Sequence, residues 1–280
     1  MTSKFIELYD PWYHRRAPAI GARLTYRGGP LLTHVKLYAI MFDDFPFATR
    51  MSDYLNWLST SDVLGELAEY NTGLGSYIGS AKLTFDTATP PPPPGGGSLE
   101  QCLLDCFQAA GYSINHPRHK KRGVRAVRRM ASRIVTDAQI QDRLTIAIRA
   151  ADVPRPDPDN MALYTLFMPS GMVVDIGQDA SCQTFCGYHD SFTLSDGTPI
   201  YYAVLPYPDC AGCTAGLAPF DALTAVASHE VCEAVTDPVP GTGWYDDQNG
   251  EVGDICAWKF RQDGGYNVQL EWSNKGNSCI

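Results

Sequence analysis

Two side chains of metal-binding type stand four residues apart in a stretch with helical periodicity, namely His229 and Glu233. In an α-helix this spacing puts both on one face, where they can bind a single metal ion, and it puts Glu230 beside that face. The pattern HExxE differs only at its last position from HExxH, in which two histidines bind zinc and the glutamate deprotonates the metal-bound water. The other positions of this face are apolar, which argues against a solvated helix face. We therefore predict that His229 and Glu233 bind a metal ion, with Zn²⁺ as the first candidate, and that Glu230 is the general base.

The segment 244–256 (WYDDQNGEVGDIC) follows the predicted helix and is dense in oxygen ligands. Each of its four acids has the chemistry of a third metal ligand, and we assign this role to Asp254. The segment also has oxygen-bearing residues around a glycine, as calcium loops do, although it lacks the twelve-residue EF-hand pattern. The candidate calcium ligands are Asp246, Asp247, Asn249 and Glu251. An acidic turn that binds no ion is the remaining alternative.

His189 lies in a second short segment of reactive residue types, 182–191 (CQTFCGYHDS). We expect a disulfide-held loop that presents His189 to the reacting centre, where it would stabilise an oxyanion in the transition state. A structural histidine is an equally open interpretation. A Cys–His nucleophilic pair is disfavoured, because Cys186 has a disulfide partner nearby and because Cys232 faces away from His229 on the predicted helix.

The chain has nine cysteines, and most of them stand in close pairs. Such a set indicates either a disulfide framework from an oxidising compartment or thiolate ligands of a metal. Only Cys210 and Cys213 have the CxxC spacing of a zinc ribbon, so we favour disulfides. Pairing between sequence neighbours leaves Cys232 as a free thiol buried in the helix. The pairs that can form locally are Cys102–Cys106, Cys182–Cys186, Cys210–Cys213 and Cys256–Cys279, and the sequence leaves the connectivity open.

The composition of the 280-residue chain is that of an acidic globular protein. Apolar residues make up 44% and charged residues 19%, which excludes a wholly disordered chain. The net charge of −9 argues against a nucleic-acid partner, because binding to phosphates needs excess Lys and Arg. No run approaches 18 consecutive apolar residues, so we expect no membrane-spanning helix. The basic run at 118–129 is a processing site, a patch for an anionic partner or, as we favour, a solvated face.

The patterning predicts an α/β (α+β) fold with a mixed central sheet, packed helices, a zincin-like active-site helix and a loop-rich C-terminal lobe that carries disulfides. A Pro- and Gly-rich loop at 88–98 interrupts a single domain of residues 1–280. The alternative is two lobes, 1–218 and 219–280, with a cleft at the helix. Strands are predicted at 35–42, 77–85, 163–168, 172–176, 200–205 and 266–272, and helices at 48–71, 99–111, 136–151 and 220–235.

Several strings in the chain resemble the EXORDIUM-like, or phosphate-induced, proteins and their bacterial and fungal relatives. They are LTYRGGPLLT (24–33), CQTFCGYHDS (182–191), ASHEVCEAVTDP (227–238), WYDDQNGEVGDIC (244–256) and GYNVQLEWSN (265–274), together with Cys210, Cys213 and Cys279. The resemblance covers the chain from residue 23 to its end, except around the Pro-rich loop and the basic run. It implies a secreted or cell-wall-associated protein with disulfides. Because the chain has the His229–Glu230 pair, it resembles the microbial branch of this family, and the resemblance implies a zincin-like peptidase activity.

The first ten residues (MTSKFIELYD) have no positively charged segment followed by an apolar one, so they predict no signal peptide. Removal of a signal, unconventional export and a cytosolic location therefore stay open beside the secreted location that the cysteines and the resemblance favour.

Two hypotheses of function follow. The first is a metal-dependent hydrolase, a zinc metallopeptidase with a peptide or protein substrate, in which His229, Glu233 and Asp254 bind the ion, Glu230 is the base and His189 steadies the oxyanion. The second is a non-enzymatic secreted or cell-wall-associated interaction protein whose metal ion is structural. Replacement of Glu230 by Gln separates them, because it stops hydrolysis in the first case and has no effect in the second.

Overall fold

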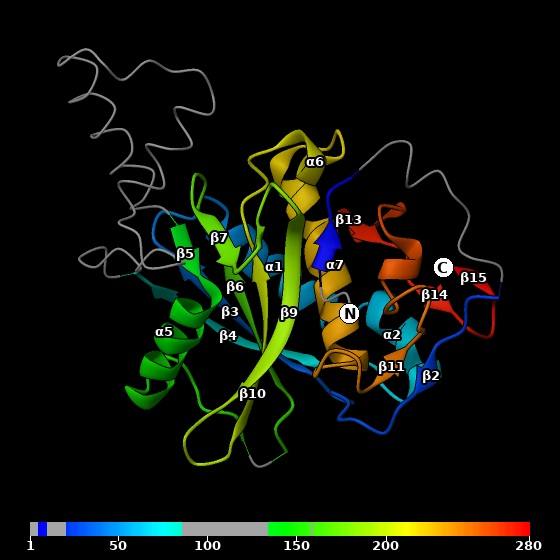
Figure 1. Cartoon of the computed structure of the whole chain (residues 1–280), viewed down its shortest axis with the longest axis horizontal. Helices are drawn as coiled ribbons and strands as arrows, with labels where there is room; N and C mark the ends of the chain where they lie inside the picture. Colours follow the sequence, from blue (N-terminus) through cyan, green and yellow to red (C-terminus); the bar gives the residue numbers. More distant parts are fainter. Residues whose placement is uncertain (1–4, 10–20, 86–133, 158) are drawn as a thin grey trace.

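The structure is a computed structural model and describes residues 5–9, 21–85, 134–157 and 159–280 (Figure 1). Four of the sequence predictions lie outside these residues. They are the loop at 88–98, the helix at 99–111, the basic run at 118–129 and the pair Cys102–Cys106.

A six-stranded mixed sheet forms the centre of the molecule, in the order β1-β9-β10-β6-β3-β4. The four strands from β10 to β4 run parallel, whereas β9 pairs antiparallel with β10 and β1 pairs antiparallel with β9. The predicted mixed sheet is therefore confirmed. The bounds are β1 Phe5–Glu7, β3 Lys36–Phe42, β4 Ser76–Leu83, β6 Ala162–Phe167, β9 Phe185–Thr193 and β10 Pro199–Leu205.

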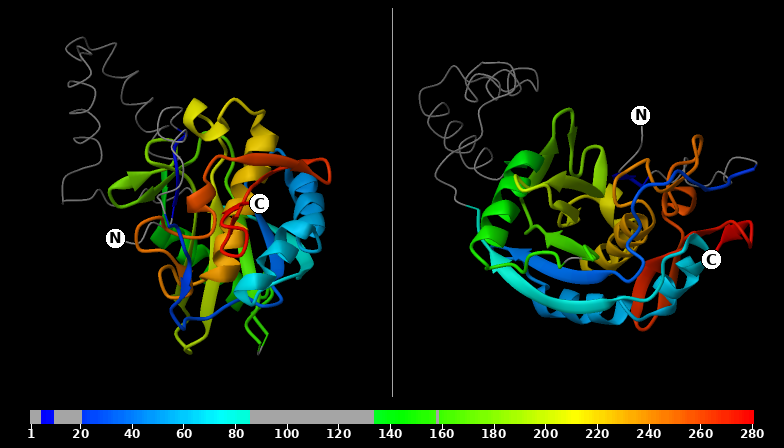
Figure 2. Two further views of the ribbon diagram at one scale, coloured as in Figure 1. Left: turned by 90° about the vertical axis from the view of Figure 1, so that its right-hand side faces the viewer. Right: turned by 90° about the horizontal axis from the view of Figure 1, so that it is seen from below.

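Both faces of this sheet are covered, which is why β3, β6 and β10 are nearly continuous apolar runs. Alternate residues of β3 enter two separate cores, with Leu37 in one and Tyr38 in the other. Helices α1 (Ala48–Leu58) and α7 (Pro219–Thr236) cover one face (Figure 2). The other face carries α5 (Asp137–Arg149) and a small sheet of β5 (Ile134–Thr136), β7 (Val173–Ile176) and β8 (Asp179–Ala180).

Local signals set the ends of the helices. The predicted start of α5 is confirmed as a capping box, in which Thr136 Oγ1 accepts from the N–H of Gln139 and the Gln139 side chain accepts from the N–H of Thr136. Pro219 begins α7, as predicted, because proline fits the first turn of a helix. The predicted helix at 48–71 is instead divided, and α1 is followed by α2 (Asp62–Gly65) and the 3₁₀ helix η1 (Glu66–Tyr70).

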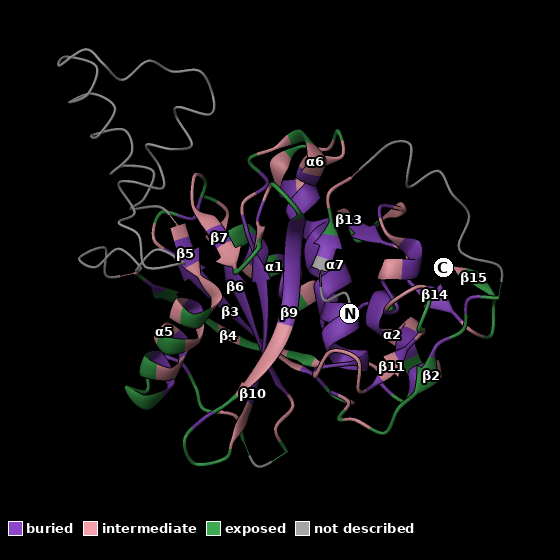
Figure 3. Cartoon of the chain, viewed as in Figure 1, coloured by how far each residue is buried: buried purple, intermediate pink, exposed green. Residues whose placement is uncertain are grey.

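The chain after α7 folds back over the side of this helix that faces away from the sheet. It begins with β11 (Trp244–Tyr245), which pairs with β2 (Thr25–Tyr26), and continues into the 3₁₀ helix η2 (Asp254–Cys256). Two hairpins follow. The first pairs β12 (Phe260–Asp263) with β13 (Tyr266–Gln269), and the second pairs β14 (Trp272–Ser273) with β15 (Ser278–Cys279). The single strand predicted at 266–272 is thus two strands in different hairpins. Because β13 packs on α7 opposite the sheet, residues 222–236 of α7 are all buried (Figure 3).

Three disulfides join the described cysteines, and they are Cys182–Cys210, Cys186–Cys213 and Cys256–Cys279. The predicted pair Cys256–Cys279 is confirmed. The pairing of sequence neighbours at 182/186 and at 210/213 is wrong, because each of these cysteines pairs with one from the other segment. The short helix α6 (Ala211–Thr214) lies beside β9, so the cysteines at 210 and 213 meet those at 182 and 186. Within the described chain Cys232 alone is free, and it is buried as predicted. These disulfides are compatible with an extracellular protein.

Among the described residues, no helix combines the length and the apolarity that a membrane crossing requires, which agrees with the sequence.

Candidate metal centre

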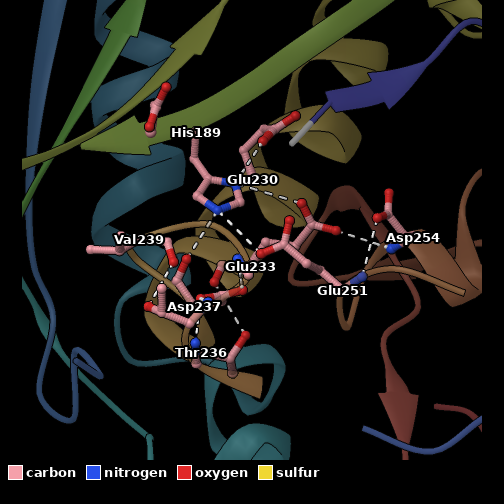
Figure 4. A network of polar contacts seen from close by, with 12 residues as sticks. His189, Glu230, Glu233, Thr236, Asp237, Val239, Glu251 and Asp254 are labelled. Carbon is pink, nitrogen blue, oxygen red and sulfur yellow. Dashed lines mark hydrogen bonds and ion pairs between the residues drawn. The ribbon is translucent and has the colours of Figure 1, made fainter. Parts of the chain in front are cut away.

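A buried polar cluster lies along one side of α7, which contributes His229, Glu230 and Glu233. None of these three side chains has any exposed surface. Figure 4 shows Glu230 and Glu233 together with His189, Glu251 and Asp254. Just past the end of the helix, the carboxylate of Asp237 accepts hydrogen bonds from the backbone N–H groups of residues 241–243 at 2.6–3.0 Å. This turn fixes the backbone carbonyl of Asp237 beside the cluster.

Other elements bring four more side chains to the same place. His189 comes from β9, Glu251 and Asp254 from the segment between β11 and β12, and Gln269 from β13. His189, Glu251 and Gln269 are buried, and Asp254 is half-buried. The cluster is therefore enclosed between the sheet, α7 and the C-terminal segment.

His189 occupies the middle of this cluster. Its Nε2 lies 3.2 Å from the backbone oxygen of Asp237 and 3.4 Å from Glu251 Oε1. Its Nδ1 lies 3.4 Å from Glu230 Oε2 and 3.6 Å from Glu233 Oε2. Both ring nitrogens thus face oxygen atoms.

The two oxygens of Glu233 have different surroundings. Oε1 accepts a hydrogen bond of 3.0 Å from the backbone N–H of Asp254, and it lies 3.1 Å from His229 Nε2, although that ring nitrogen is not aligned for a full hydrogen bond. Oε2 has no hydrogen-bond partner. Glu233 consequently stands between the two histidines, with one oxygen toward each.

Gln269 holds the ring of His229 from the other side. Its Nε2 lies 2.7 Å from His229 Nδ1 and donates to the backbone oxygen of Gly253 at 3.0 Å. Its Oε1 accepts from the backbone N–H of Trp258 at 3.0 Å. These contacts orient the amide, because the opposite orientation would face its NH₂ group to an N–H and its oxygen to a carbonyl.

Two glycines allow the cluster to close. A Cβ on Gly187 would lie 2.8 Å from Glu230 Oε1, and one on Gly253 would lie 2.6 Å from His229 Nδ1 and 3.0 Å from Glu233 Oε1. All three distances are shorter than van der Waals contact. A side chain at either position would push β9 or the C-terminal segment away from α7.

Burial raises the pKa values of the acids. It raises the pKa of Glu233 to about 7 against the opposing effect of His189, and it also raises the pKa of Glu230. The pKa values of Glu251 and Asp254 are raised well above the ordinary range by burial, with Glu233 adding to the effect at both. For His189 burial lowers the pKa, but Glu251, Glu230 and Glu233 together raise it well above 6.5.

Two overlapping groups in the cluster could hold a metal ion. One contains His189, Glu230 and Glu233, and the other contains His229, Glu233 and Asp254. In each group one ligand atom per residue lies within 4.8 Å of the others. Glu233 belongs to both groups, whereas Glu251 belongs to neither.

The structure brings the five site residues predicted from the sequence into this one cluster. The environment of His189 differs from the prediction, because this residue lies on strand β9 and not in a disulfide-held loop. Sequence reasoning gave no site role to Gln269 or Asp237, and it treated Glu251 as a possible third metal ligand, less favoured than Asp254, and as a calcium ligand. The sequence does contain a signal for the group of His189, Glu230 and Glu233, because Glu230 and Glu233 are three residues apart and therefore share one face of the helix.

The four candidate calcium ligands do not gather around one point. Asp246 Oδ1 accepts from the N–H groups of Gln248 and Asn249 in a turn, and the Asn249 side chain also donates to this oxygen. Asp247 is exposed and pairs with Arg27. Glu251 is fully buried against His189. The prediction of calcium at these residues is therefore not supported by their arrangement.

Comparison with family models, with curated proteins and with solved structures finds no match to this chain. The kinship with EXORDIUM-like proteins stays a prediction that rests on the strings quoted above.

Proposed function

We propose that this protein is a metal-dependent hydrolase, of the zinc metallopeptidase kind, which binds a divalent ion at Glu233 and cleaves peptide bonds with water. The observation that carries the proposal is a set of buried carboxylate oxygens without hydrogen-bond partners. They are Glu230 Oε1, Glu233 Oε2 and both oxygens of Glu251.

These unpartnered oxygens support the binding of a cation. A buried carboxylate is costly unless hydrogen bonds or a positive charge compensate it. Among the described residues, the ion pairs of Glu230, Glu233 and Glu251 involve the histidines His189 and His229 and no Lys or Arg. A divalent cation supplies the missing charge and takes carboxylate and imidazole ligands together.

The residues of the cluster also suit the chemistry of hydrolysis. A bound divalent ion would polarise a carbonyl and lower the pKa of water. If His229, Glu233 and Asp254 bind the ion, Glu230 is free to accept the proton from that water. If His189, Glu230 and Glu233 bind it, Glu251 is the buried carboxylate that remains.

A second candidate function is favoured by the complete burial of the cluster. His189, Glu233 and Glu251 have no exposed surface, and a peptide needs an opening to reach them. A structural ion needs none. The alternative is therefore a non-enzymatic secreted or cell-wall-associated protein in which the ion fastens the C-terminal segment to α7.

The first test is metal content and metal-dependent stability of the purified protein. We expect one equivalent of divalent metal by elemental analysis, and a melting temperature that falls after chelation and recovers with Zn²⁺. Glu233→Gln should abolish both, since Glu233 belongs to both candidate groups. Asp246→Asn is the matched control, because Asp246 lies outside both groups, and it should keep the metal. A metal-free protein whose stability ignores Zn²⁺ would contradict the proposal.

The second test separates the two functions. A chelator-sensitive screen against peptide libraries should detect hydrolysis that either Glu230→Gln or Glu251→Gln stops while the metal stays bound. If the protein binds metal but neither substitution alters any measurable hydrolysis, the ion is structural.

A further inference from the structure

We infer that the two buried histidines have different roles, and that His189 binds the ion through Nδ1, with Glu230 and Glu233, while His229 holds Glu233 in place. This inference rests on the proposed function only in that a divalent ion binds at Glu233. It reverses the assignment that the HExxE spacing suggests, because the histidine of the motif becomes the positioning residue.

Nδ1 of His189 faces two carboxylate oxygens, Glu230 Oε2 at 3.4 Å and Glu233 Oε2 at 3.6 Å, and these oxygens can share an ion with it. The backbone oxygen of Asp237, 3.2 Å from Nε2, can only accept a hydrogen bond, so Nε2 is the nitrogen that bears the proton. In the neutral ring Nδ1 then has an unshared electron pair, directed between Glu230 Oε2 and Glu233 Oε2. A metal-binding histidine usually donates its other N–H to a carbonyl or carboxylate in this way.

The contacts of His229 place the proton on the nitrogen that faces Glu233. The Gln269 amide, whose orientation is set by Trp258 and Gly253, donates to Nδ1 at 2.7 Å. Nδ1 is therefore the acceptor of the ring, and in the neutral ring the proton lies on Nε2. A protonated Nε2 cannot bind a metal ion. Nε2 lies 3.1 Å from Glu233 Oε1, which is within ion-pair distance although the N–H is not aligned for a full hydrogen bond.

Glu233 divides its two oxygens in agreement with this assignment. Oε1 faces two donors, the backbone N–H of Asp254 and Nε2 of His229. Oε2 has no partner, is fully buried, and lies on the side of His189. Glu230 likewise keeps one oxygen without a partner. Of the unpartnered oxygens, Glu233 Oε2 lies 3.6 Å from Nδ1 of His189 and Glu251 Oε1 lies 3.4 Å from its Nε2, so a cation on this side of the cluster offsets buried charge.

Nuclear magnetic resonance of the nitrogen-15-histidine-labelled protein tests the inference directly. The chain has six histidines, and the spectra of His189→Gln and His229→Gln assign the two that matter. On addition of Zn²⁺ to the chelated protein, the Nδ1 resonance of His189 should shift by tens of parts per million, whereas the ring nitrogens of His229 should keep the pattern of a ring protonated on Nε2. A Zn²⁺-induced shift of His229 Nε2, alone or beside that of His189, would overturn the inference.

The same two variants form a matched pair for binding. Gln at 189 keeps an N–H that can reach the oxygen of Asp237 but removes the nitrogen at the Nδ1 position, and Gln at 229 keeps a donor toward Glu233. We expect His189→Gln to weaken Zn²⁺ binding by at least about 100-fold and His229→Gln by less than about 10-fold, the lower limit for loss of an outer-shell partner. The reverse order, or equal losses, would contradict the inference.

The outcomes also separate this inference from the proposed function. If the wild-type protein binds no Zn²⁺ and no histidine resonance moves, the metal proposal itself fails and the inference fails with it. If Zn²⁺ binds with one equivalent and Glu233→Gln abolishes binding, but His229 is the residue that responds, only the inference fails.

Discussion

The segment 244–256 contains two acids, Asp246 and Glu251, whose carboxylates have opposite surroundings. Asp246 accepts hydrogen bonds from the backbone N–H groups of Arg23, Gln248 and Asn249 at 2.7–2.9 Å. Glu251, five residues further on, is fully buried, and neither of its oxygens has a hydrogen-bond partner. The first carboxylate stabilises a turn, whereas the second adds to an uncompensated charge.

This difference shows that the density of acids in a sequence does not locate a cation site. The number of hydrogen-bond donors around each acid locates such a site, because a carboxylate that already accepts hydrogen bonds from several N–H groups is stabilised little further by a metal ion. Among the described residues, few donors reach Glu251, Glu233 and Glu230, and four of their six carboxylate oxygens have no hydrogen-bond partner. The contrast between the turn acid and the cluster acids can be measured in the metal-free protein by their opposite effects on stability.

The largest expected effect is the pH dependence of stability after chelation. Burial raises the pKa of Glu233 from 4.5 to about 7, so the folded protein binds more protons than the unfolded chain in this interval. Its ionisation therefore costs stability as pH rises from 4.5 to 7, by about 3 kcal/mol at the upper end. The raised pKa of His189 acts in the same direction, because its favourable charge is lost as pH rises through that pKa.

Urea unfolding of the chelated protein between pH 5 and pH 8 measures this effect. We expect stability to fall with rising pH, Glu233→Gln to flatten the curve, and saturating Zn²⁺ to reverse the trend, because metal binding requires the ionised acid. Stability of the chelated protein that increases from pH 5 to pH 7 would show that the cluster acids are compensated in some other way.

Much of the fold was predictable because its signals are local. Thr136 and Gln139 predict the start of α5, Pro219 predicts the start of α7, and the apolar runs predict β3, β6 and β10. The disulfides at 182/210 and 186/213 were not predictable, since they depend on α6 lying beside β9, which is a tertiary arrangement. The break after α1 was missed because the apolar residues on both sides of residues 59–61, which are Ser, Thr and Ser, led to the prediction of a single helix.

The candidate site was predictable in its residues but not in its contacts. Helical spacing is sufficient to group His229, Glu230 and Glu233, and the acids of 244–256 are recognisable ligands. The partner of each ring nitrogen depends on Gln269 and on the carbonyl of Asp237, and no sequence pattern specifies a backbone oxygen or the orientation of an amide. The roles of the two histidines therefore required the structure.

An effect of intermediate size on stability is expected from substitutions that remove one acid of each kind. Asp246→Ala removes the acceptor of several N–H groups and should destabilise the protein by about 2 kcal/mol. Those same N–H groups lower the pKa of Asp246 against the effect of its burial, so its contribution is present above pH 4 and is lost as pH falls further.

Glu251→Gln should have the opposite sign. In the chelated protein at pH 8 it should leave the free energy of unfolding unchanged or raise it, since Gln resembles the neutral acid that burial favours. Denaturant unfolding of both variants measures the difference. If Glu251→Gln costs as much as Asp246→Ala, Glu251 has partners in solution and the contrast between the two acids disappears.

The smallest expected effect concerns Asp247, which stands next to Asp246 in sequence but points to solvent. Its side chain is 89% exposed and pairs with Arg27, which also lies over the ring of Tyr245. An exposed ion pair contributes about 0–1 kcal/mol and is screened by salt, so Asp247→Asn should change stability by less than about 0.5 kcal/mol, and the change should vanish in 1 M NaCl. Zn²⁺ binding should be unaffected at either salt concentration. A loss of metal affinity in this variant would extend the cation site into the turn and would restore the calcium-loop interpretation of 246–251, because only a shared ion can couple an exposed acid to the buried cluster at high salt.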